Sequence, residues 1–216
     1  MQPIPFYPLL KRFLDVVVSL AGLLCLWPLF LFIAVAVKLD SPGPILYSQE
    51  RLTLNRKPFR VHKFRSMVVG ARARHLRGEV PREQLITRVG RFLRYTHFDE
   101  FPQLFNVLAG DLSLVGPRPL MAKWLNEKTP DPGFADSRFT VKAGMAGLER
   151  LYSLLPGARK QFLRLFPRFA VVPGKEAWQL DGYYAKHQSL FFDAKIFFLT
   201  FFMTLYRVLE LVFRRV

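Results

Sequence analysis

The chain has 216 residues, 51% of them hydrophobic and 22 of them phenylalanine, and a formal net charge of +16. This length suffices for one domain with its own core, and the single cysteine, Cys25, excludes an internal disulfide. Strong basic charge on so apolar a chain favours a membrane surface and phosphate ligands over nucleic acid, the usual partner of a basic soluble domain.

The first predicted element is an apolar helix over residues 13–37, in which Asp15 is the one charged residue. At about 1.5 Å per residue, such a helix is long enough to cross a hydrocarbon core of roughly 30 Å. It is too long for the core of a signal peptide, and no small-residue cleavage site follows it. We therefore expect the segment to be retained in the mature protein.

Pro28 lies near the middle of this segment and predicts a kink, because proline removes one helical hydrogen bond and clashes with the preceding turn. Basic residues flank both ends, at Lys11, Arg12 and Lys38. A bent helix would return both ends to one membrane face, whereas a tolerated proline would allow an ordinary spanning helix. The residues alone leave both readings open. In either case most basic residues follow the segment, which predicts a cytoplasmic body.

Residues 45–51 and 58–63 predict two short strands of a hairpin, with Asn55 near the turn. The hairpin region is strongly basic, which indicates either a solvated face or a contact with phosphate or lipid headgroups; its basic residues are Lys57, Arg60, Lys63 and Arg65. Residues 68–86 are polar and predict a helix and a loop.

Apolar residues at helical spacing predict a short helix that includes Phe101, Leu104, Phe105 and Leu108. Gly110 suits its C-terminal cap, and Pro102 is acceptable only in its first turn. We therefore expect the helix to begin near Asp99, with Asp99 as its N-cap. The positive end of the helix would keep Asp99 and Glu100 ionised and attract phosphate.

Two adjacent carboxylates are suitable ligands for Mg²⁺, and an ionised aspartate can attack phosphorus to form an acyl phosphate. The alternative for Asp99 and Glu100 is a capping pair without a catalytic role. Residues 110–116 predict a strand, and Pro117 and Pro119 flank Arg118 after it. If the chain doubles back at Gly110, a helix of about 15 Å and a strand of about 23 Å bring Arg118 near Asp99.

A guanidinium held between two prolines suits a bidentate grip on a diphosphate. Arg91 and Arg94 add positive charge on the same side, and for each arginine the alternative is a salt bridge or a lipid contact. Further along, residues 190–215 are rich in phenylalanine, with scattered charges and an uncharged stretch, 196–206, too short to span. They predict an amphipathic helix in the membrane interface, with a core helix as the alternative.

The order of motifs along most of the chain resembles the bacterial sugar transferase family, the monotopic phosphoglycosyl transferases. The matching motifs are Lys11-Arg12-Phe13-Leu14-Asp15, Pro28, Gln49-Glu50-Arg51, Lys63-Phe64-Arg65-Ser66-Met67, Thr87-Arg88-Val89-Gly90-Arg91-Phe92-Leu93-Arg94, Asp99-Glu100-Phe101-Pro102-Gln103-Leu104-Phe105-Asn106-Val107, Gly110-Asp111 and Val115-Gly116-Pro117-Arg118-Pro119-Leu120.

The resemblance implies a monotopic α+β fold, mostly helical with small β-hairpins. Residues 1–40 would form a re-entrant membrane helix kinked at Pro28, residues 41–189 a catalytic domain on the cytoplasmic face of the bacterial inner membrane, and residues 190–216 an interfacial helix of the same domain. It implies partners among membrane lipids and none among nucleic acids, and it leaves a homodimer open.

The resemblance also implies an activity: transfer of a phosphosugar from a nucleotide-diphosphate sugar, with a UDP-sugar expected, to polyprenyl (undecaprenyl) phosphate. This is the first membrane step in assembling exopolysaccharide, capsule, O-antigen or glycoprotein glycans. Asp99 would attack the β-phosphate and form a covalent intermediate, with Glu100 as metal or positioning partner and Mg²⁺ required. The candidate phosphate-binding residues are Lys63, Arg65, Arg91, Arg94, Arg118 and Arg138.

The chain departs from the family pattern in two places. Thr53, Asn55 and Arg56 occupy a hairpin turn that is usually rich in glycine. Residues 138–151 keep Arg138, Val141, Gly144 and Gly147 but replace several others, including an Ala-Gln pair by Glu149-Arg150. These changes bear on the identity of the donor. They also motivate an alternative, a catalytically divergent family member that acts as a membrane scaffold or partner for glycan enzymes.

Overall fold

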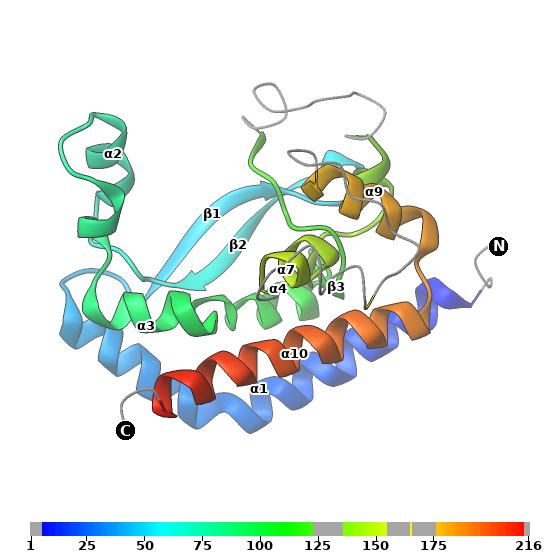
Figure 1. The fold of residues 1–216 in the computed structure, drawn as a ribbon, viewed down its shortest axis with the longest axis horizontal. Helices are drawn as coiled ribbons and strands as arrows, with labels where there is room; N and C mark the ends of the chain where they lie inside the picture. Colours follow the sequence, from blue (N-terminus) through cyan, green and yellow to red (C-terminus); the bar gives the residue numbers. More distant parts are fainter. Residues whose placement is uncertain (1–5, 123–135, 155–164, 166–175, 214–216) are drawn as a thin grey trace.

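The computed structural model describes residues 6–122, 136–154, 165 and 176–213, which are mostly helical. Two long helices, α1 (Tyr7–Asp40) and α10 (Leu190–Phe213), run along one side of the molecule, and the shorter elements lie on the other side of them (Figure 1). Among the described residues, α1 is the one helix long and apolar enough to cross a membrane, and 11% of its most apolar window is buried.

Helix α1 continues through Pro28 and is bowed, with its middle farthest from the hairpin (Figure 1). Its outer face is apolar and exposed, as at Leu24, Trp27 and Phe32. Asp15 instead faces the body, where its Oδ1 accepts hydrogen bonds from the Leu114 amide at 2.9 Å and the Ser113 hydroxyl at 3.1 Å. The one charge within the apolar segment therefore docks the helix against the body.

Both ends of α1 are bound to the same body. Near its start, Lys11 donates to Asp193 Oδ2 at 2.6 Å, and Arg12 donates to the carbonyl of Leu108 at 2.8 Å. At its end, Arg65 donates to the carbonyl of Ser41 at 2.5 Å, and Asp40 accepts from the amide of Val89 at 2.8 Å. Arg12 and Arg65 thereby satisfy carbonyls at helix C-termini, and Asp40 satisfies an amide at the start of α3, groups that have no intrahelical partner.

The predicted hairpin is confirmed. Strands β1 (Leu46–Leu52) and β2 (Pro58–Phe64) pair antiparallel, with Leu46 opposite Phe64. The turn contains the 3₁₀ helix η1 (Leu54–Arg56), in which Asn55 and Arg56 have φ values of 55° and 58°. Positive φ is the conformation that glycine adopts most easily, which explains why glycines are usual at this turn in the family that the chain resembles.

The hairpin leads into α2 (Ala71–Leu76), η2 (Arg82–Leu85), α3 (Arg88–Thr96), η3 (Phe98–Glu100) and α4 (Gln103–Ala109). Thr87 caps α3, because its hydroxyl oxygen accepts from the Gly90 amide at 3.0 Å. Gly90 also allows α3 to lie close to the strand end, since a Cβ there would sit 2.1 Å from the carbonyl oxygen of Ser66.

The second sheet corrects the expectation of hairpins alone. Strand β3 (Ser113–Val115) pairs in parallel with β4 (Gly144–Ala146), so the chain crosses over between them instead of making a tight turn. A Cβ at Gly144 would lie 2.1 Å from the backbone nitrogen of Gly116, so the close approach requires glycine. The remaining described elements are η4 (Arg138–Thr140), α7 (Leu148–Leu154) and α9 (Glu176–His187).

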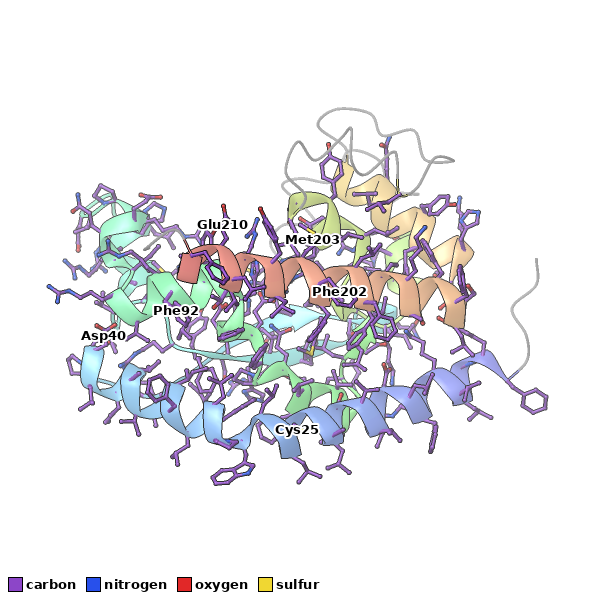
Figure 2. All side chains as sticks on the ribbon, turned by 60° about the horizontal axis from the view of Figure 1, so that its bottom comes forward. Cys25, Asp40, Phe92, Phe202, Met203 and Glu210 are labelled. Atoms are coloured by element: carbon purple, nitrogen blue, oxygen red, sulfur yellow. The ribbon has the colours of Figure 1, made fainter. Side chains whose placement is uncertain are left out.

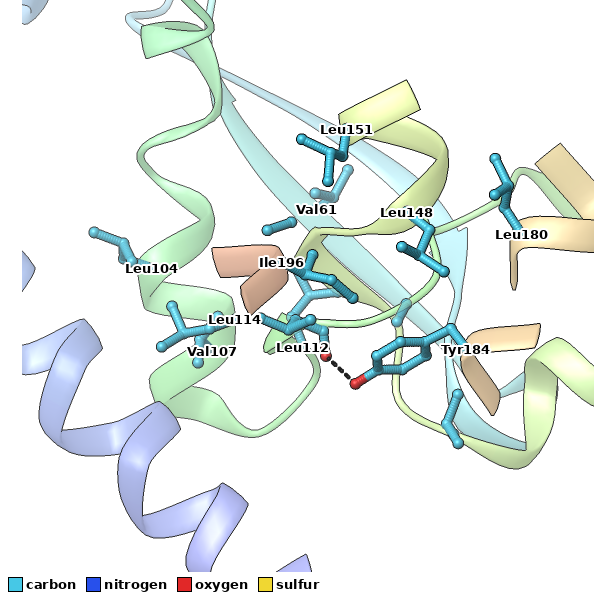
Figure 3. Packing of buried hydrophobic residues seen from close by; sticks show 14 of the residues in the cluster. Val61, Leu104, Val107, Leu112, Leu114, Leu148, Leu151, Leu180, Tyr184 and Ile196 are labelled. Atoms are coloured by element: carbon cyan, nitrogen blue, oxygen red, sulfur yellow. Dashed lines mark hydrogen bonds between the residues drawn. The ribbon is translucent and has the colours of Figure 1, made fainter. Parts of the chain in front are cut away.

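The main core joins both sheets to the C-terminal helices. Figure 3 shows Leu148 of α7 and Tyr184 of α9 gathered around Ile196 of α10, all three nearly inaccessible to solvent. The Tyr184 hydroxyl lies 2.6 Å from Asp193 Oδ1 and 3.1 Å from the carbonyl of Val115. Helix α10 thus has one face in the core and leaves the other, rich in phenylalanine, exposed.

Candidate functional site

The Asp99-Glu100 pair lies in η3, between α3 and α4, and not at the start of a helix as expected. His97 ends α3 in the left-handed region with φ 60°, and α4 begins at Gln103 after Pro102. The Asp99 side chain therefore caps no helix. The short turn directs both carboxylates inward, so that Asp99 is 8% and Glu100 5% exposed. Positive charge at the pair comes from side chains and not from a helix end.

Three basic side chains converge on Glu100. Lys63 Nζ donates to its Oε1 at 2.6 Å, Arg118 Nη2 donates to the same oxygen at 3.2 Å, and Arg150 Nη1 contacts Oε2. Burial would raise the pKa of Glu100, but the charges of Arg150, Arg118 and Lys63 outweigh it and hold that pKa well below its ordinary value. Glu100 is therefore ionised at neutral pH.

Asp99 has a different environment. Burial and, next, the negative charge of Glu100 raise the pKa of Asp99 to about 6, while Lys63, Arg150 and Arg94 act in the opposite direction. Within the described part of the chain, no group donates a hydrogen bond to its carboxylate. Asp99 is thus a buried carboxylate of raised basicity to which no described residue donates a hydrogen bond, as suits a nucleophile.

His97 lies beside the pair and adds no charge to it. Burial and the neighbouring charge of Arg150 lower the pKa of the His97 imidazole to about 3. The ring is therefore neutral at physiological pH.

Next to Glu100 a small basic cleft opens, lined by Arg51, Lys63, Gln103 and Arg118 together with Gly144. The Arg118 side chain is 44% exposed, so its guanidinium faces both Glu100 and solvent. The backbone of Arg118 is fixed by Arg138, whose Nη2 donates to the Arg118 carbonyl. The predicted meeting of Arg118 with the carboxylate pair is confirmed at Glu100.

The structure brings only some of the predicted basic residues to the carboxylates. Lys63 and Arg118 contact Glu100, and Arg94 lies near enough to lower the pKa of Asp99. Arg65 is buried and donates its hydrogen bonds around the last turn of α1, to Val37, Ser41 and Pro42. Arg65 therefore caps the C-terminal end of α1.

Two further arginines are placed apart from the pair. Arg91 is exposed on α3, and within the described part of the chain it forms no hydrogen bond or ion pair with the carboxylates. Arg138 is 4% exposed and forms an ion pair with Asp181 at 3.0 Å. Binding of phosphate by Arg65, Arg91 and Arg138 remains a prediction.

Sequence reasoning missed Arg150 and Arg51 as members of the site, and Asp181 as the partner of Arg138. Arg150 was nevertheless visible as a charge at a position where the resembled family carries a neutral glutamine. Asp181 offered no such signal, since it lies in the middle of α9, 43 positions from Arg138.

The carboxylate oxygens of Asp99 and Glu100 are suitable ligands for a hard divalent cation. No cluster of three or more His, Cys, Asp or Glu side chains that could hold a metal occurs among the described residues. Magnesium, however, is commonly held by one or two carboxylates, with water and substrate phosphate oxygens completing its octahedron. Asp99 and Glu100 can supply two such carboxylates, and the Asp99 oxygens are not used by other described groups.

Comparison with known proteins identifies relatives over nearly the whole chain. The family model described as bacterial sugar transferase matches residues 6–207. A UDP-N-acetylgalactosamine-undecaprenyl-phosphate N-acetylgalactosaminephosphotransferase of Aeromonas hydrophila is 32% identical over 199 residues, covering 92% of this chain and 44% of the relative. A UDP-glucose:undecaprenyl-phosphate glucose-1-phosphate transferase of Escherichia coli K12 is 38% identical over 196 residues, covering 90% of this chain and 40% of the relative.

A shorter relative matches almost end to end. The exopolysaccharide production protein PSS of Rhizobium leguminosarum bv. phaseoli is 37% identical over 194 residues, covering 88% of this chain and 92% of that protein. The chain therefore spans less than half of the Aeromonas and Escherichia relatives and nearly the whole length of the Rhizobium one.

Proposed function

The chain belongs to the bacterial sugar transferase family, and from this premise we propose that it transfers a phosphosugar from a UDP-sugar to undecaprenyl phosphate. The proposal rests on the different environments of the two carboxylates, Asp99 and Glu100. Glu100 is ionised and held by three cations, whereas Asp99 is buried, more basic than usual and without a donor from the described residues. One carboxylate is thus placed to organise charge and the other to react.

In the proposed first step, a carboxylate oxygen of Asp99 attacks the β-phosphorus of the donor. The bond from that phosphorus to the bridging oxygen breaks, uridine monophosphate leaves with the electron pair, and the phosphosugar stays on Asp99 as an acyl phosphate. Arg118 and Lys63 line the adjacent cleft. They are placed to balance the charge of the diphosphate and to orient it for attack.

In the proposed second step, a phosphate oxygen of undecaprenyl phosphate attacks the same phosphorus. The acyl phosphate bond breaks, Asp99 returns to its carboxylate form, and the product is an undecaprenyl diphosphate sugar. Because Asp99 is buried, the intermediate is shielded from water between the two steps.

We propose Mg²⁺ as the cofactor, held by Asp99 and Glu100 together with oxygens of the substrate. When bound, it would neutralise phosphate charge and fix the orientation of the phosphate oxygens. The remaining positive charge at the site comes from the chain itself, through Lys63, Arg118 and Arg150.

We further propose that α1 is a re-entrant membrane helix, that α10 lies in the interface, and that the body faces the cytoplasm. Contacts at both ends of α1 support this arrangement, because Lys11 and Arg12 bind the body at one end and Arg65 binds it at the other. A spanning helix would have to release one of these ends to the opposite side of the membrane.

A labelling experiment separates re-entrant from spanning α1. Phe6 precedes α1 and Leu39 lies in its last turn, and they are 70% and 82% exposed. In a Cys25→Ser background, we expect Phe6→Cys and Leu39→Cys both to react with a membrane-impermeant maleimide in inside-out vesicles and neither to react in intact spheroplasts. Labelling of one cysteine from each side would establish a spanning helix.

Two radiolabels test the transfer reaction. With a donor labelled in the sugar, we expect label to remain on the denatured protein, and with a donor labelled in the uracil we expect none to remain. Release of uridine monophosphate without acceptor should not exceed one equivalent per protein. Sustained turnover with no labelled protein at any time would contradict the covalent route.

The alternative, a catalytically divergent scaffold, rests on the engagement of Glu100 by Arg150 at a position where neutral glutamine is usual in the family. A screen of nucleotide sugars distinguishes the two proposals. Release of uridine monophosphate from any of them supports the transferase, and inactivity with all of them in the presence of bound Mg²⁺ supports the scaffold.

A further inference from the structure

A second and larger hollow lies between α1 and α10. Its volume is about 400 Å³, and its walls are formed by apolar side chains of the two helices, among them Val18, Leu26, Phe201 and Leu205. Leu104 of α4 contributes to the floor. α1 and α10 run alongside each other in Figures 1 and 2, and Figure 2 shows elements from the middle of the chain between them. We call this hollow the interhelix cavity.

The interhelix cavity adjoins the reaction site, because Glu100 and Met145 line both the cavity and the basic cleft. His97 and Arg150 also line the cavity. Glu100 therefore stands between two compartments of opposite character. One is polar and cationic, as a diphosphate requires, and the other is apolar and bounded by the long apolar helices α1 and α10.

Two buried polar atoms at this cavity lack partners among the described residues. The hydroxyl of Thr200, a residue that is 8% exposed, makes no hydrogen bond, and neither does Nε of Arg150. Both residues line the cavity. Buried donors are ordinarily satisfied, so an unpaired hydroxyl and an unpaired guanidinium nitrogen in one cavity point to a ligand that carries oxygen as well as apolar groups.

We infer that the interhelix cavity binds the phosphate-proximal isoprene units of the polyprenyl phosphate acceptor, with the phosphate directed toward Arg150. This inference rests on the proposed function and assigns the acceptor's place within it. A cavity of this volume suits a drug-sized ligand, so it holds the first few isoprene units and leaves the rest of the chain to the bilayer. The chain would then approach Asp99 from the membrane side while the donor occupies the basic cleft.

The charge distribution favours this acceptor over an ordinary phospholipid. A prenyl phosphate is a monoester whose anionic head follows directly on the apolar chain. That arrangement matches a cavity whose apolar walls end at Arg150. A phospholipid would have to place a glycerol and two acyl chains in the same space.

Filling the cavity tests the assignment. A Cβ at Gly22 of α1 would meet Leu104 Cδ1 at 3.4 Å, an ordinary contact, so Gly22→Leu is tolerated at its base while the rest of the side chain occupies the cavity. Leu24→Phe is the matched control, because Leu24 is on the same helix, is 67% exposed and does not line the cavity. Thr200→Val removes the unpaired hydroxyl and keeps the shape of the side chain.

We expect Gly22→Leu to raise KM for undecaprenyl phosphate about tenfold or more, because side chains added to a packed space are poorly accommodated. The effect on the donor-only burst of uridine monophosphate should be much smaller, and Thr200→Val should act in the same direction more weakly. A KM no higher than that of Leu24→Phe would overturn the inference. So would an equal effect on the burst, which would indicate a general structural defect.

Photocrosslinking identifies the molecule that occupies the interhelix cavity, even if no phosphosugar transfer is detected. A polyprenyl phosphate carrying a diazirine near its phosphate end, in phosphatidylglycerol nanodiscs, should label peptides of α1 and α10. Excess undecaprenyl phosphate should protect them, and excess phosphatidylglycerol should not. Equal protection by phosphatidylglycerol would assign the cavity to membrane lipid in general. Absence of any burst together with specific crosslinking would refute the proposed reaction and leave the binding site in place.

Discussion

Arg150 of α7 contacts the carboxylate oxygen of Glu100 that Lys63 and Arg118 do not use. Both residues are buried, at 8% and 5% exposure, so the contact lies in a medium where charge interactions are strong. The resembled family carries a neutral glutamine at this position. Arg150 therefore brings a positive charge to Glu100 where the resembled pattern has a neutral side chain.

The first prediction concerns this added cation. Arg150→Gln should retain most of the donor-only burst, because glutamine can still donate to Oε2 of Glu100. Arg150→Met should lose about tenfold to a hundredfold in kcat/KM, the range expected when a buried charged acceptor loses a charge-assisted donor. Donor-only bursts and circular dichroism on both variants provide the measurement. Equal activity of the two variants would show that the contact does not position Glu100.

The second prediction separates reactivity from stability at Asp99. Asp99→Asn should abolish the burst, with a loss on the order of 10⁴ or more. The same variant should be more stable above pH 6. The pKa of Asp99 is raised from 3.8 to about 6, so its ionised form destabilises the fold, by on the order of 1 to 3 kcal/mol.

The stability gained in Asp99→Asn depends on pH, because the pKa of Asp99 is higher in the folded protein than in the unfolded chain. The folded protein binds the Asp99 proton more tightly than the unfolded chain does, so stability falls as pH rises from about 4 to about 6. Thermal unfolding of the parent and of Asp99→Asn should therefore coincide below pH 4 and diverge above it. An inactive variant that is also less stable at pH 8 would indicate a structural role for Asp99.

The third prediction concerns the pH dependence of the burst. If Asp99 attacks as a carboxylate, the burst rate should rise with pH through about 6. Glu100→Gln should move this acid limb to lower pH, because it removes the negative charge that, after burial, most raises the pKa of Asp99. Stopped-flow bursts at a fixed Mg²⁺ concentration give the profile. An acid limb that stays in place or moves to higher pH would contradict the assignment of the titrating group.

Features of the fold and site that depend on residues close together in the sequence could be predicted, whereas those that depend on contacts between distant residues could not. The length and residue types of the two segments, with Asn55 near the turn, predicted the hairpin, and Gly110 caps α4 with φ 88° as predicted. These features depend on neighbouring residues. The approach of Arg118 to the carboxylate pair was also predictable, because it needs only two short elements and one reversal of the chain. The sequence placed Arg118 near Asp99, and the structure places it on Glu100.

Other parts of the site depend on contacts that no local pattern encodes. The left-handed conformation of His97 moves the start of α4 to Gln103 and places Asp99 in a 3₁₀ turn. Arg150 reaches Glu100 across 50 positions through the parallel pairing of β3 with β4. Only packing reveals that Arg138 faces Asp181 and not the cleft.

The fourth prediction tests what Arg138 does. Arg138 pairs with Asp181 at 3.0 Å and also donates to the carbonyl of Arg118. Both partners of the ion pair are buried, so Arg138→Met alone should destabilise the protein by about 3 to 5 kcal/mol, because it leaves Asp181 uncompensated. Arg138→Met with Asp181→Leu should recover much of this stability, since apolar pairs often replace buried ion pairs without loss.

The double variant discriminates between two roles for Arg138. Its stability is restored, but it cannot donate to the Arg118 carbonyl, so we expect KM for the nucleotide sugar to stay raised by about tenfold, the equivalent of one hydrogen bond. A donor KM that returns to the parental value would show that Arg138 serves stability alone. If Arg138 instead bound phosphate directly, Asp181→Leu alone would leave the donor KM unchanged. In the arrangement described here that single change also weakens donor binding, because it frees the guanidinium that supports Arg118.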